Sequence, residues 1–259
     1  MRKKLSSLLL AFCFMISICP LQAMASESID RQLINRGYPI ELIKIMEDEQ
    51  KTDLIAKNCY YESAKTYSYD ENGELINVIN YDENGIAPLG QIKASHLVLT
   101  ITTNKSGSKT VLQFNYKWKT LPVNRYQDPM SIAWSSSVFK YESGSFRKVD
   151  KYKHVINGGT NGKVYTATQS DETSYAKASK DYVSWYADLK GYTSNVISLY
   201  GYGTLTLVPK KKGKSTQVFG HYVHNKTAVS LSLSYSAGSF SVTGNSTFDE
   251  LGTDATLTS

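Results

Sequence analysis

Cysteine is scarce in this sequence, which has only three in 259 residues. Cys13 and Cys19 lie in an apolar N-terminal run, so Cys59 is the only thiol in the rest of the chain. One thiol cannot form an internal disulfide, which excludes the class of small secreted scaffolds held together by disulfide bridges. Cys59 follows a helical pattern, where we predict a buried small side chain, with a catalytic thiol as the alternative.

The sequence also lacks a strong excess of charge. Lys and Arg number 29 against 23 Asp and Glu, and removal of residues 1–25 leaves 26 against 23. This small basic excess does not indicate a nucleic-acid partner. Motifs of the H-E-x-x-H, C-x-x-C, P-loop, G-x-G-x-x-G and G-x-S-x-G kinds are absent. We therefore expect a non-enzymatic protein without a metal site or a cofactor.

A long apolar run occurs only at the N-terminus. Basic residues at positions 2–4 precede the run Leu5–Pro20, and Ala23 and Ala25 are the small residues that signal peptidase requires. This pattern predicts a signal peptide, residues 1–25, cleaved after Ala25. Lipidation at Cys19 is the alternative, but Ile18 is too large for the preceding position. No later run approaches the roughly 20 residues of a membrane helix. We therefore expect a secreted protein without a transmembrane segment.

Alternating apolar and polar residues dominate the chain from about residue 93. The clearest runs are TVLQFNYKWK at 110–119 and AVSLSLSYS at 228–236, in which serines alternate with apolar residues. Gly-, Ser- and Asn-rich turns recur between such runs. This pattern is typical of antiparallel sheet with one apolar and one polar face. Residues 93–259 are predicted to form an antiparallel β-sandwich or barrel-like body. Residues 182–189 fit a strand or a helix, and their aromatic content favours a strand.

A helical segment is predicted before this body, over residues 26–64. Ser28 is a suitable N-cap, Gly37 a suitable end for the first helix, and Pro39 opens a second. Apolar residues recur at helical spacing, so the segment is expected to cover the body as an amphipathic cap. Insertion in a membrane is the alternative, but the acidic residues at positions 47–49 and 53 oppose binding to anionic lipid.

A β-hairpin and turn region is predicted at residues 65–92, where the pentapeptide YDENG occurs twice. Asn72-Gly73 and Asn84-Gly85 fit the type I′ turns of hairpins. A calcium loop of the EF-hand kind would need Glu at position 12, where the two copies have Ile79 and Gln91. Residues 67–79 resemble one YD (RHS-type) repeat, and that resemblance implies a hairpin without implying an activity.

Four histidines are candidates for catalysis or metal binding. His221 and His224 are three residues apart, and in a strand this spacing places them on opposite faces, which opposes a shared metal. His96 is expected on the polar face of its strand, together with Thr100 and Thr102 and in contact with solvent. His154 has Asp150 nearby in the sequence, and a His–Asp pair supports a nucleophile in hydrolases.

A basic cluster and an enrichment in tyrosine are the remaining binding signals. The cluster lies at a predicted hairpin tip and could contact an anionic cell-wall polymer or lipid headgroups; a solvated turn is the alternative. The 19 tyrosines could line a glycan or peptide groove, or cover the edge of the sandwich. The candidate binding residues are Lys210, Lys211, Lys212, Lys214, Tyr200, Tyr202, His221 and His224.

The signal peptide, the helical opening RGYPIELIKIM and the late GHYVHN segment resemble uncharacterised secreted proteins of Gram-positive bacteria. This resemblance implies an exoprotein with a sandwich-like body. The first hypothesis is a non-enzymatic protein that binds a cell-surface polymer, a glycan or a protein receptor. The second is a membrane-acting bacteriocin or toxin that inserts its strands as β-hairpins. The third is a histidine-dependent hydrolase.

Overall fold

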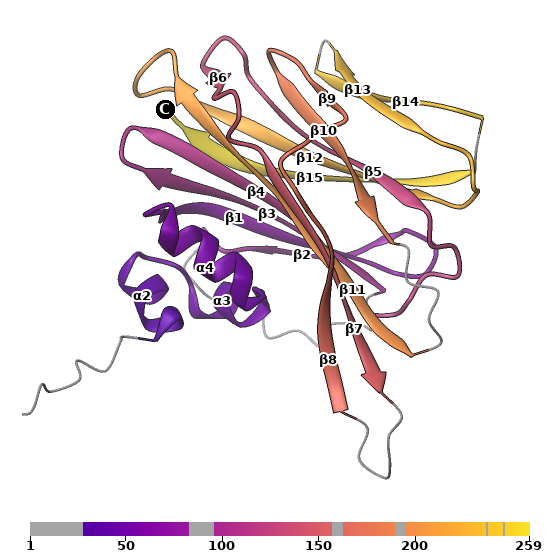
Figure 1. Cartoon of the computed structure of the whole chain (residues 1–259). Coiled ribbons are helices and arrows are strands. Elements are labelled where there is room, and N and C mark those ends of the chain that lie inside the picture. The colour runs from indigo at the N-terminus through magenta and orange to yellow at the C-terminus, as the bar shows by residue number, and fades with distance from the viewer. Residues whose placement is uncertain (1–27, 83–95, 157–162, 190–194, 237, 246) are drawn as a thin grey trace, which may run out of the picture.

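The computed structural model describes residues 28–82, 96–156, 163–189 and 195–259, except Ala237 and Ser246. Three short helices precede antiparallel strands that form two facing sheets and one small additional sheet (Figure 1). The prediction of a mainly β, antiparallel sandwich behind a short helical segment is confirmed. The predicted signal peptide lies outside the described residues.

The larger sheet, sheet A, receives strands from most of the chain length. Its order is β2-β1-β3-β4-β11-β7-β8, and β6 also pairs with β11. The strands are β1 (Tyr60–Tyr69), β2 (Leu75–Asn80), β3 (Leu97–Ser106), β4 (Lys109–Trp118), β6 (Phe139–Tyr141), β7 (Arg147–Ile156), β8 (Lys163–Glu172) and β11 (Val196–Pro209).

The second layer, sheet B, has the order β15-β12-β5-β10-β9. Its strands are β5 (Gln127–Trp134), β9 (Lys177–Ala178), β10 (Tyr182–Asp188), β12 (Ser215–Asn225) and β15 (Phe248–Thr258). The ambiguous segment at 182–189 is therefore a strand, as its aromatic content predicted. The small sheet consists of β13 (Ser232–Ser236) and β14 (Ser239–Thr243) alone.

The main core fills the space between sheets A and B. Phe114 from β4, Trp134 from β5 and Trp185 from β10 are almost completely buried in it. Gly203 of β11 permits the closest approach of the two layers, since a Cβ atom there would lie 2.4 Å from a ring carbon of Trp185. The apolar rows that the alternation predicted therefore face each other across one core.

The helices form a separate cap with its own small core on the outer face of sheet A (Figure 1). They are α2 (Ile29–Asn35), α3 (Ile40–Ile45) and α4 (Asp48–Ala56). Leu33, Leu42 and Leu54 are buried together with Cys59. Burial raises the pKa of the Cys59 thiol to about 11, so this side chain packs as the neutral thiol that the sequence favoured.

Ser28 caps α2 as predicted, because its Oγ accepts a hydrogen bond from the backbone N–H of Arg31 at 3.3 Å. Gly37 has a φ of +84° and ends the helix as predicted. None of the helices in the described part of the chain has the length and apolar content needed to cross a lipid bilayer.

The boundaries of the helical and hairpin regions differ from the predicted ranges. The last helix ends at Ala56 and β1 begins at Tyr60, within the range 26–64 predicted to be helical. β1 pairs with β2 on one side and with β3 on the other. The described part of the predicted hairpin region, 65–92, therefore belongs to sheet A.

The turn between β1 and β2 is not the predicted type I′ turn. Gly73 has a φ of +79°, but Asn72 has a negative φ. The Asp70 carboxylate organises this turn by accepting hydrogen bonds from the backbone N–H groups of Asn72 and Glu74, both at 2.9 Å. The second predicted turn, at Asn84-Gly85, lies outside the described residues.

Candidate ligand site beneath the helical cap

Part of the polar face of sheet A lies beneath the helical cap and is closed to solvent. Thr100, Thr102 and Gln113 are each at most 5% exposed. The expectation that Thr100 and Thr102 share a solvated face with His96 is therefore wrong for the two threonines. Only His96, at the start of the strand, keeps partial exposure.

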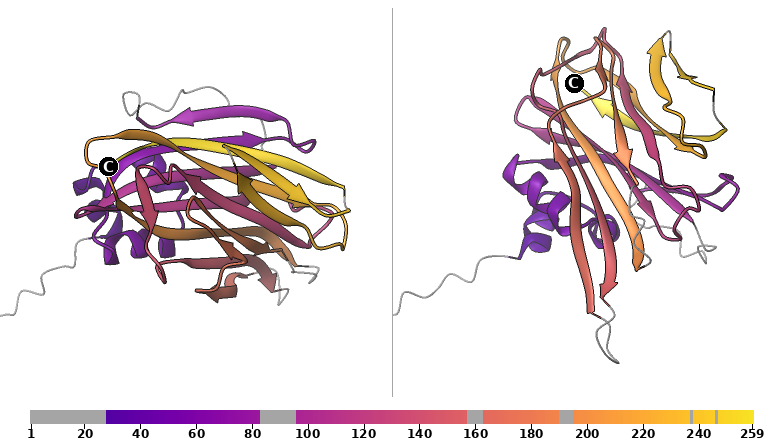
Figure 2. Two further views of the ribbon diagram at one scale, coloured as in Figure 1. Left: turned by 90° about the horizontal axis from the view of Figure 1, so that it is seen from above. Right: turned by 45° about the vertical axis from the view of Figure 1, so that its right-hand side comes forward.

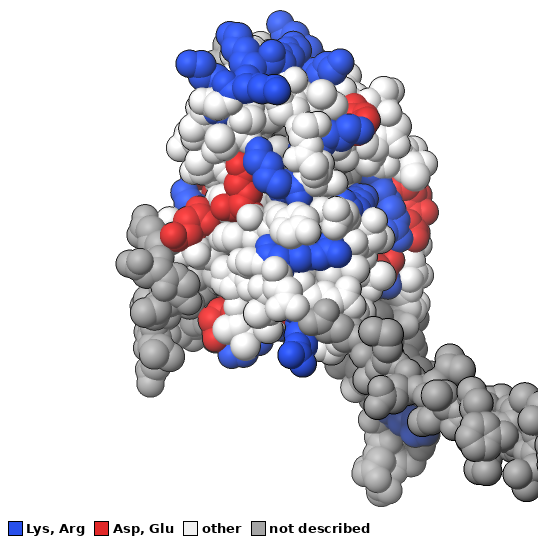
Figure 3. All heavy atoms as spheres, turned by 90° about the vertical axis from the view of Figure 1, so that its left-hand side faces the viewer, with Lys and Arg blue, Asp and Glu red and all other residues white. Residues whose placement is uncertain are grey.

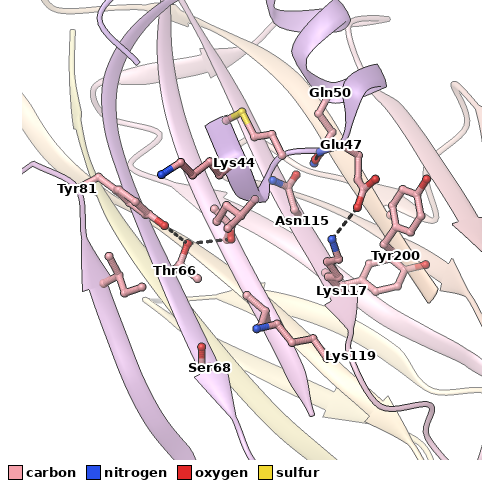
Figure 4. Close-up of a pocket in the computed structure, with 17 residues that line it drawn as sticks. Lys44, Glu47, Gln50, Thr66, Ser68, Tyr81, Asn115, Lys117, Lys119 and Tyr200 are labelled. Carbon is pink, nitrogen blue, oxygen red and sulfur yellow. Dashed lines mark hydrogen bonds and ion pairs between the residues drawn. The ribbon is translucent and has the colours of Figure 1, made fainter. Parts of the chain in front are cut away.

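A cavity of about 180 Å³ lies where the cap does not fill the space above the sheet (Figure 4). Lys44, Met46 and Glu47 reach it from the cap, and side chains of β1, β3, β4 and β11 form its floor. We call this cavity the cap pocket. The polar residues that line it are Lys44, Glu47, Gln50, Thr66, Ser68, Tyr81, Thr100, Asn115, Lys117, Lys119 and Tyr200.

Hydroxyl groups and an unpaired amide oxygen form the polar part of the floor. The hydroxyl oxygens of Thr66 and Thr100 lie 3.0 Å apart, and the Thr66 hydroxyl donates to the Tyr81 hydroxyl at 3.4 Å. The side-chain oxygen of Asn115 is buried without a hydrogen-bond partner among the described residues. A buried acceptor of this kind is costly unless a donor reaches it, so the cap pocket suits a ligand with hydroxyl groups.

The charges around the cap pocket are mainly positive. Lys117 pairs with Glu47 at 2.7 Å, and Lys153 reaches the same carboxylate at 3.2 Å. Burial acts to raise the pKa of Glu47, but the hydrogen bonds and charges of the two lysines outweigh burial and lower it. Lys119 also lines the cap pocket, is exposed to solvent, and forms no side-chain hydrogen bond or ion pair within the described ranges. A free ammonium beside a neutralised pair favours an anionic ligand.

Glu47, Glu49 and Asp53, three of the acidic residues expected to oppose membrane binding, hold the cap against sheet A. Arg147 of β7 contacts both carboxylate oxygens of Asp53 at 2.7 Å and one of Glu49 at 3.0 Å. It also makes two hydrogen bonds of 2.8 Å to Asp171 on β8. Lys151 pairs with Glu49 as well. The cap is therefore fixed in place by ion pairs that link α4 to β7 and β8.

The two candidate tyrosines lie near each other on β11 but have different surroundings. Tyr200 lines the cap pocket. The Lys153 ammonium lies 5.4 Å from the centre of its ring, within the range of a cation–π contact. Tyr202 lies under α4, where its hydroxyl donates to Asp53 at 2.7 Å. Tyr200 is therefore placed to contact a ligand, while Tyr202 helps to dock the cap.

The four candidate lysines lie together at the turn between β11 and β12, and all are exposed. Figure 3 shows basic side chains gathered at this end of the molecule. Lys210 donates a hydrogen bond to the backbone carbonyl of Ser136 at 2.8 Å. None of the four lines the cap pocket. The structure therefore does not bring this cluster together with Tyr200.

His221 and His224 lie on opposite faces of β12. His221 stacks on Phe240 of β14, with ring centres 4.4 Å apart, and has the Glu250 carboxylate 3.1 Å away. Burial lowers the pKa of His221 to about 4. His224 points to the other side, where its Nδ1 lies 2.9 Å from Asp128. No group of three metal-ligating side chains occurs among the described residues.

Among the described residues, the contacts of the histidines are mainly with aromatic rings and carboxylates. His154 lies between the rings of Tyr152 and Tyr165, while Asp150 accepts a hydrogen bond from Tyr116 at 2.8 Å. No hydrogen bond described for a histidine of this chain connects it to a serine, threonine or cysteine side chain. The contacts of His154 are therefore those of a side chain that packs between aromatic rings.

Comparisons with known proteins give no family for this chain. No family model matches it, and no curated protein matches it. Among solved structures, Clostridium perfringens delta-toxin is 8% identical, with 77% of this chain and 89% of that chain covered and a TM-score of 0.32. The C-terminal domain of the Streptococcus agalactiae AgI/II polypeptide BspA is 13% identical, with 77% and 50% covered and a TM-score of 0.32.

A third structure, titled "Pore forming protein", is 11% identical, with 62% of this chain and 88% of that chain covered and a TM-score of 0.31. Scores in this range reflect general β-rich architecture and do not assign a function.

Sequence reasoning missed Asp128, which lies at the centre of a buried polar network. Its carboxylate accepts hydrogen bonds from the Tyr222 hydroxyl and from the backbone N–H of Asn225 at 2.9 Å, besides its contact with His224. Trp118 donates to Tyr222 at 2.9 Å and extends the network. Asp128 lies near the start of β5, and nothing in the neighbouring sequence shows that this acidic side chain is buried.

Proposed function

We propose that this chain is a secreted bacterial protein that binds an anionic, hydroxyl-bearing unit of a cell-surface polymer in the cap pocket. The observation that carries the proposal is that two groups without a hydrogen-bond partner line the same cavity. They are the Lys119 ammonium and the side-chain oxygen of Asn115. The first group favours a phosphate or carboxylate, and the second requires a donor such as a hydroxyl. Polyol phosphates and acidic sugars combine both groups.

The size of the cap pocket supports a small unit and not an extended ligand. Its volume of about 180 Å³ is below the roughly 300 Å³ at which pockets for drug-sized molecules begin. Met46, Ile79 and Val98 add an apolar wall that can contact the carbon skeleton of such a unit. One repeating unit of a polymer would therefore enter the cap pocket while its neighbours stay outside.

Substitution of Lys119 by alanine is expected to weaken binding of the polymer by about 10-fold or more, since a charge-assisted hydrogen bond contributes about 1.5–3 kcal/mol. The measurement is titration calorimetry with glycerol phosphate oligomers and, separately, with uronic acid oligomers, which distinguishes the two anions. Lys212→Ala is the matched control, because it removes an exposed lysine outside the cap pocket. Its affinity should stay within about 2-fold of the unchanged protein.

Two results would overturn the proposal. The first is that neither oligomer binds the unchanged protein. The second is that Lys212→Ala lowers the binding affinity as much as Lys119→Ala or more. The second result would place the binding surface at the lysines of the β11–β12 turn.

A further inference from the structure

The segment between Lys226 and Asp249 contains no charged residue. These 22 residues, Thr227–Phe248, form the longest uncharged run after the predicted signal peptide. They contain β13 and β14, and Gly238 between these strands has a φ of +90°. The first arm of this hairpin is residues 227–236 and the second is residues 239–248, ten residues each, and the last of them, Phe248, begins β15. A β-strand that crosses a bilayer needs about 9–11 residues, so each arm has the required length.

The two faces of this hairpin differ in a regular way. On one face, Tyr235 pairs with Phe240 and Leu233 pairs with Val242. The other face has only hydroxyl side chains, in the pairs Ser232 with Thr243, Ser234 with Ser241 and Ser236 with Ser239. Elsewhere, an exposed strand of this chain such as β8 contains Lys163, Asp171 and Glu172. A hairpin with one apolar face and one uncharged hydroxyl face matches strands that contact lipid on one side and a water-filled lumen on the other.

The hairpin is attached to sheet B through side chains, which include Phe240 stacked on His221 and Tyr235 beside the ring of Tyr182. β13 and β14 form a two-stranded sheet without a backbone ladder to sheet B. Figures 1 and 2 show both strands outside the layer formed by β12, β5 and β10. Leu231 and Leu233 are buried against Val223, in a cluster separate from the main core. The side chains of β14 are half-buried or exposed. The hairpin can therefore leave sheet B without opening the main core.

The ends of the hairpin are marked by charge. Lys226 and Asp249 form an ion pair of 2.7 Å at the base, where the two arms meet the body. Charged groups at this position would stay in the aqueous interface while the uncharged arms lie in hydrocarbon. In the folded protein the apolar face packs on sheet B, and this packing does not require the absence of charge from the opposite, solvent-facing side.

We propose that residues 226–249 form a membrane-inserting β-hairpin, which detaches from sheet B and crosses a lipid bilayer together with hairpins of further copies of this chain. Several copies are required, because a single hairpin would leave unpaired backbone groups at both edges in hydrocarbon. The smallest membrane barrels have eight strands, which corresponds to at least four copies. The apolar face contacts lipid and the hydroxyl face lines the lumen. This inference does not depend on the function proposed for the cap pocket.

The test uses the two faces of β14. Val242→Arg places a charge on the lipid face, and Ser241→Arg places the same charge one residue away on the lumen face. Both positions are at least partly exposed in the folded protein, so both variants are expected to fold. With dye-filled vesicles of equal parts phosphatidylcholine and phosphatidylglycerol, Val242→Arg should reduce leakage about 30-fold or more. Ser241→Arg should retain leakage within about 3-fold. Circular dichroism in buffer verifies the folding of both variants.

A second measurement locates the inserted segment. In a Cys59→Ser background, a polarity-sensitive dye is attached to a cysteine placed at Val242, Ser241 or, as a control on another exposed strand, Val164. Addition of the same vesicles should shift the emission at Val242 to the blue and leave Ser241 and Val164 unchanged. The proposal is wrong if the unchanged protein causes no leakage and no labelled variant shows a shift, if Val242→Arg and Ser241→Arg leak equally, or if Val164 responds and Val242 does not.

Discussion

Replacement of Asp128 by alanine is expected to lower the free energy of unfolding by about 3–5 kcal/mol, because several buried polar groups would lose their acceptor and each such loss costs about 1–3 kcal/mol. Asp128 is completely buried and accepts from the Tyr222 hydroxyl and the Asn225 backbone N–H, with His224 Nδ1 as a third contact. Alanine would leave all three groups without this acceptor. At about 2–4 °C per kcal/mol for a chain of this size, the Tm should fall by about 6–20 °C.

Two control variants separate this effect from the simple loss of an acidic residue. Asp128→Asn keeps one acceptor oxygen and should cost less than Asp128→Ala. Asp48→Ala removes an acidic side chain that is 94% exposed, and its effect should stay within about 1 kcal/mol. Urea denaturation followed by circular dichroism gives the three values. A loss of less than 1 kcal/mol for Asp128→Ala would contradict the central role of this network.

Replacement of Arg147 by alanine is expected to release the helical cap and cost about 2–4 kcal/mol, because three neighbouring carboxylates would lose their shared guanidinium and keep only Lys151 and the Tyr202 hydroxyl as partners. Arg147 connects Asp53 and Glu49 of the cap to Asp171 of β8. A released cap no longer forms one wall of the cap pocket, so affinity for the surface polymer should fall together with stability. Arg147→Lys keeps the charge but not the two-pronged geometry and should give an intermediate loss.

Limited proteolysis measures the release of the cap, and cleavage should appear first within residues 29–58.

The ion pairs that dock the cap also make the stability of the protein depend on pH. The Arg147 hydrogen bond lowers the pKa of Asp171, and Lys117 and Lys153 lower that of Glu47 against the effect of burial. These carboxylates contribute stability that is fully present above the unfolded value of about 4 and is lost as pH falls through the lower folded values. Unchanged proteolysis of Arg147→Ala at pH 7 would contradict this view of cap docking.

Much of the body could be predicted because strand periodicity is a local property. The alternation in residues 110–119 places Phe114 and Tyr116 in the core between the sheets, where the structure has them. Pairing could not be predicted in the same way. β11 lies between β4 and β7, and the selection of these partners depends on contacts between segments that are distant in the chain.

The candidate site was largely beyond prediction from the sequence. A row of threonine, glutamine and asparagine on a strand indicates a solvated face, and nothing local shows that Thr100 and Asn115 lie beneath helices. Tyr200 was identified as a binding candidate because of tyrosine enrichment, and it does line the cap pocket. Lys119 and Asn115, which give the cap pocket its chemistry, belong to polar rows that resemble many others in the chain.

The cap and the uncharged hairpin occupy different layers of the molecule. The cap covers the outer face of sheet A, while β13 and β14 lie outside sheet B (Figure 1). Variants at Lys119 and at Val242 therefore affect separate sites, and each proposal can fail without the other.

Hydrogen exchange with and without glycerol phosphate oligomers tests ligand binding in the cap pocket most directly. We predict that the ligand slows amide exchange in α3, β3 and β4, and that Lys119→Ala abolishes this protection. Protection confined to the β11–β12 turn, or no change anywhere in the chain with either the glycerol phosphate or the uronic acid oligomers, would contradict the assignment of the cap pocket as the ligand site.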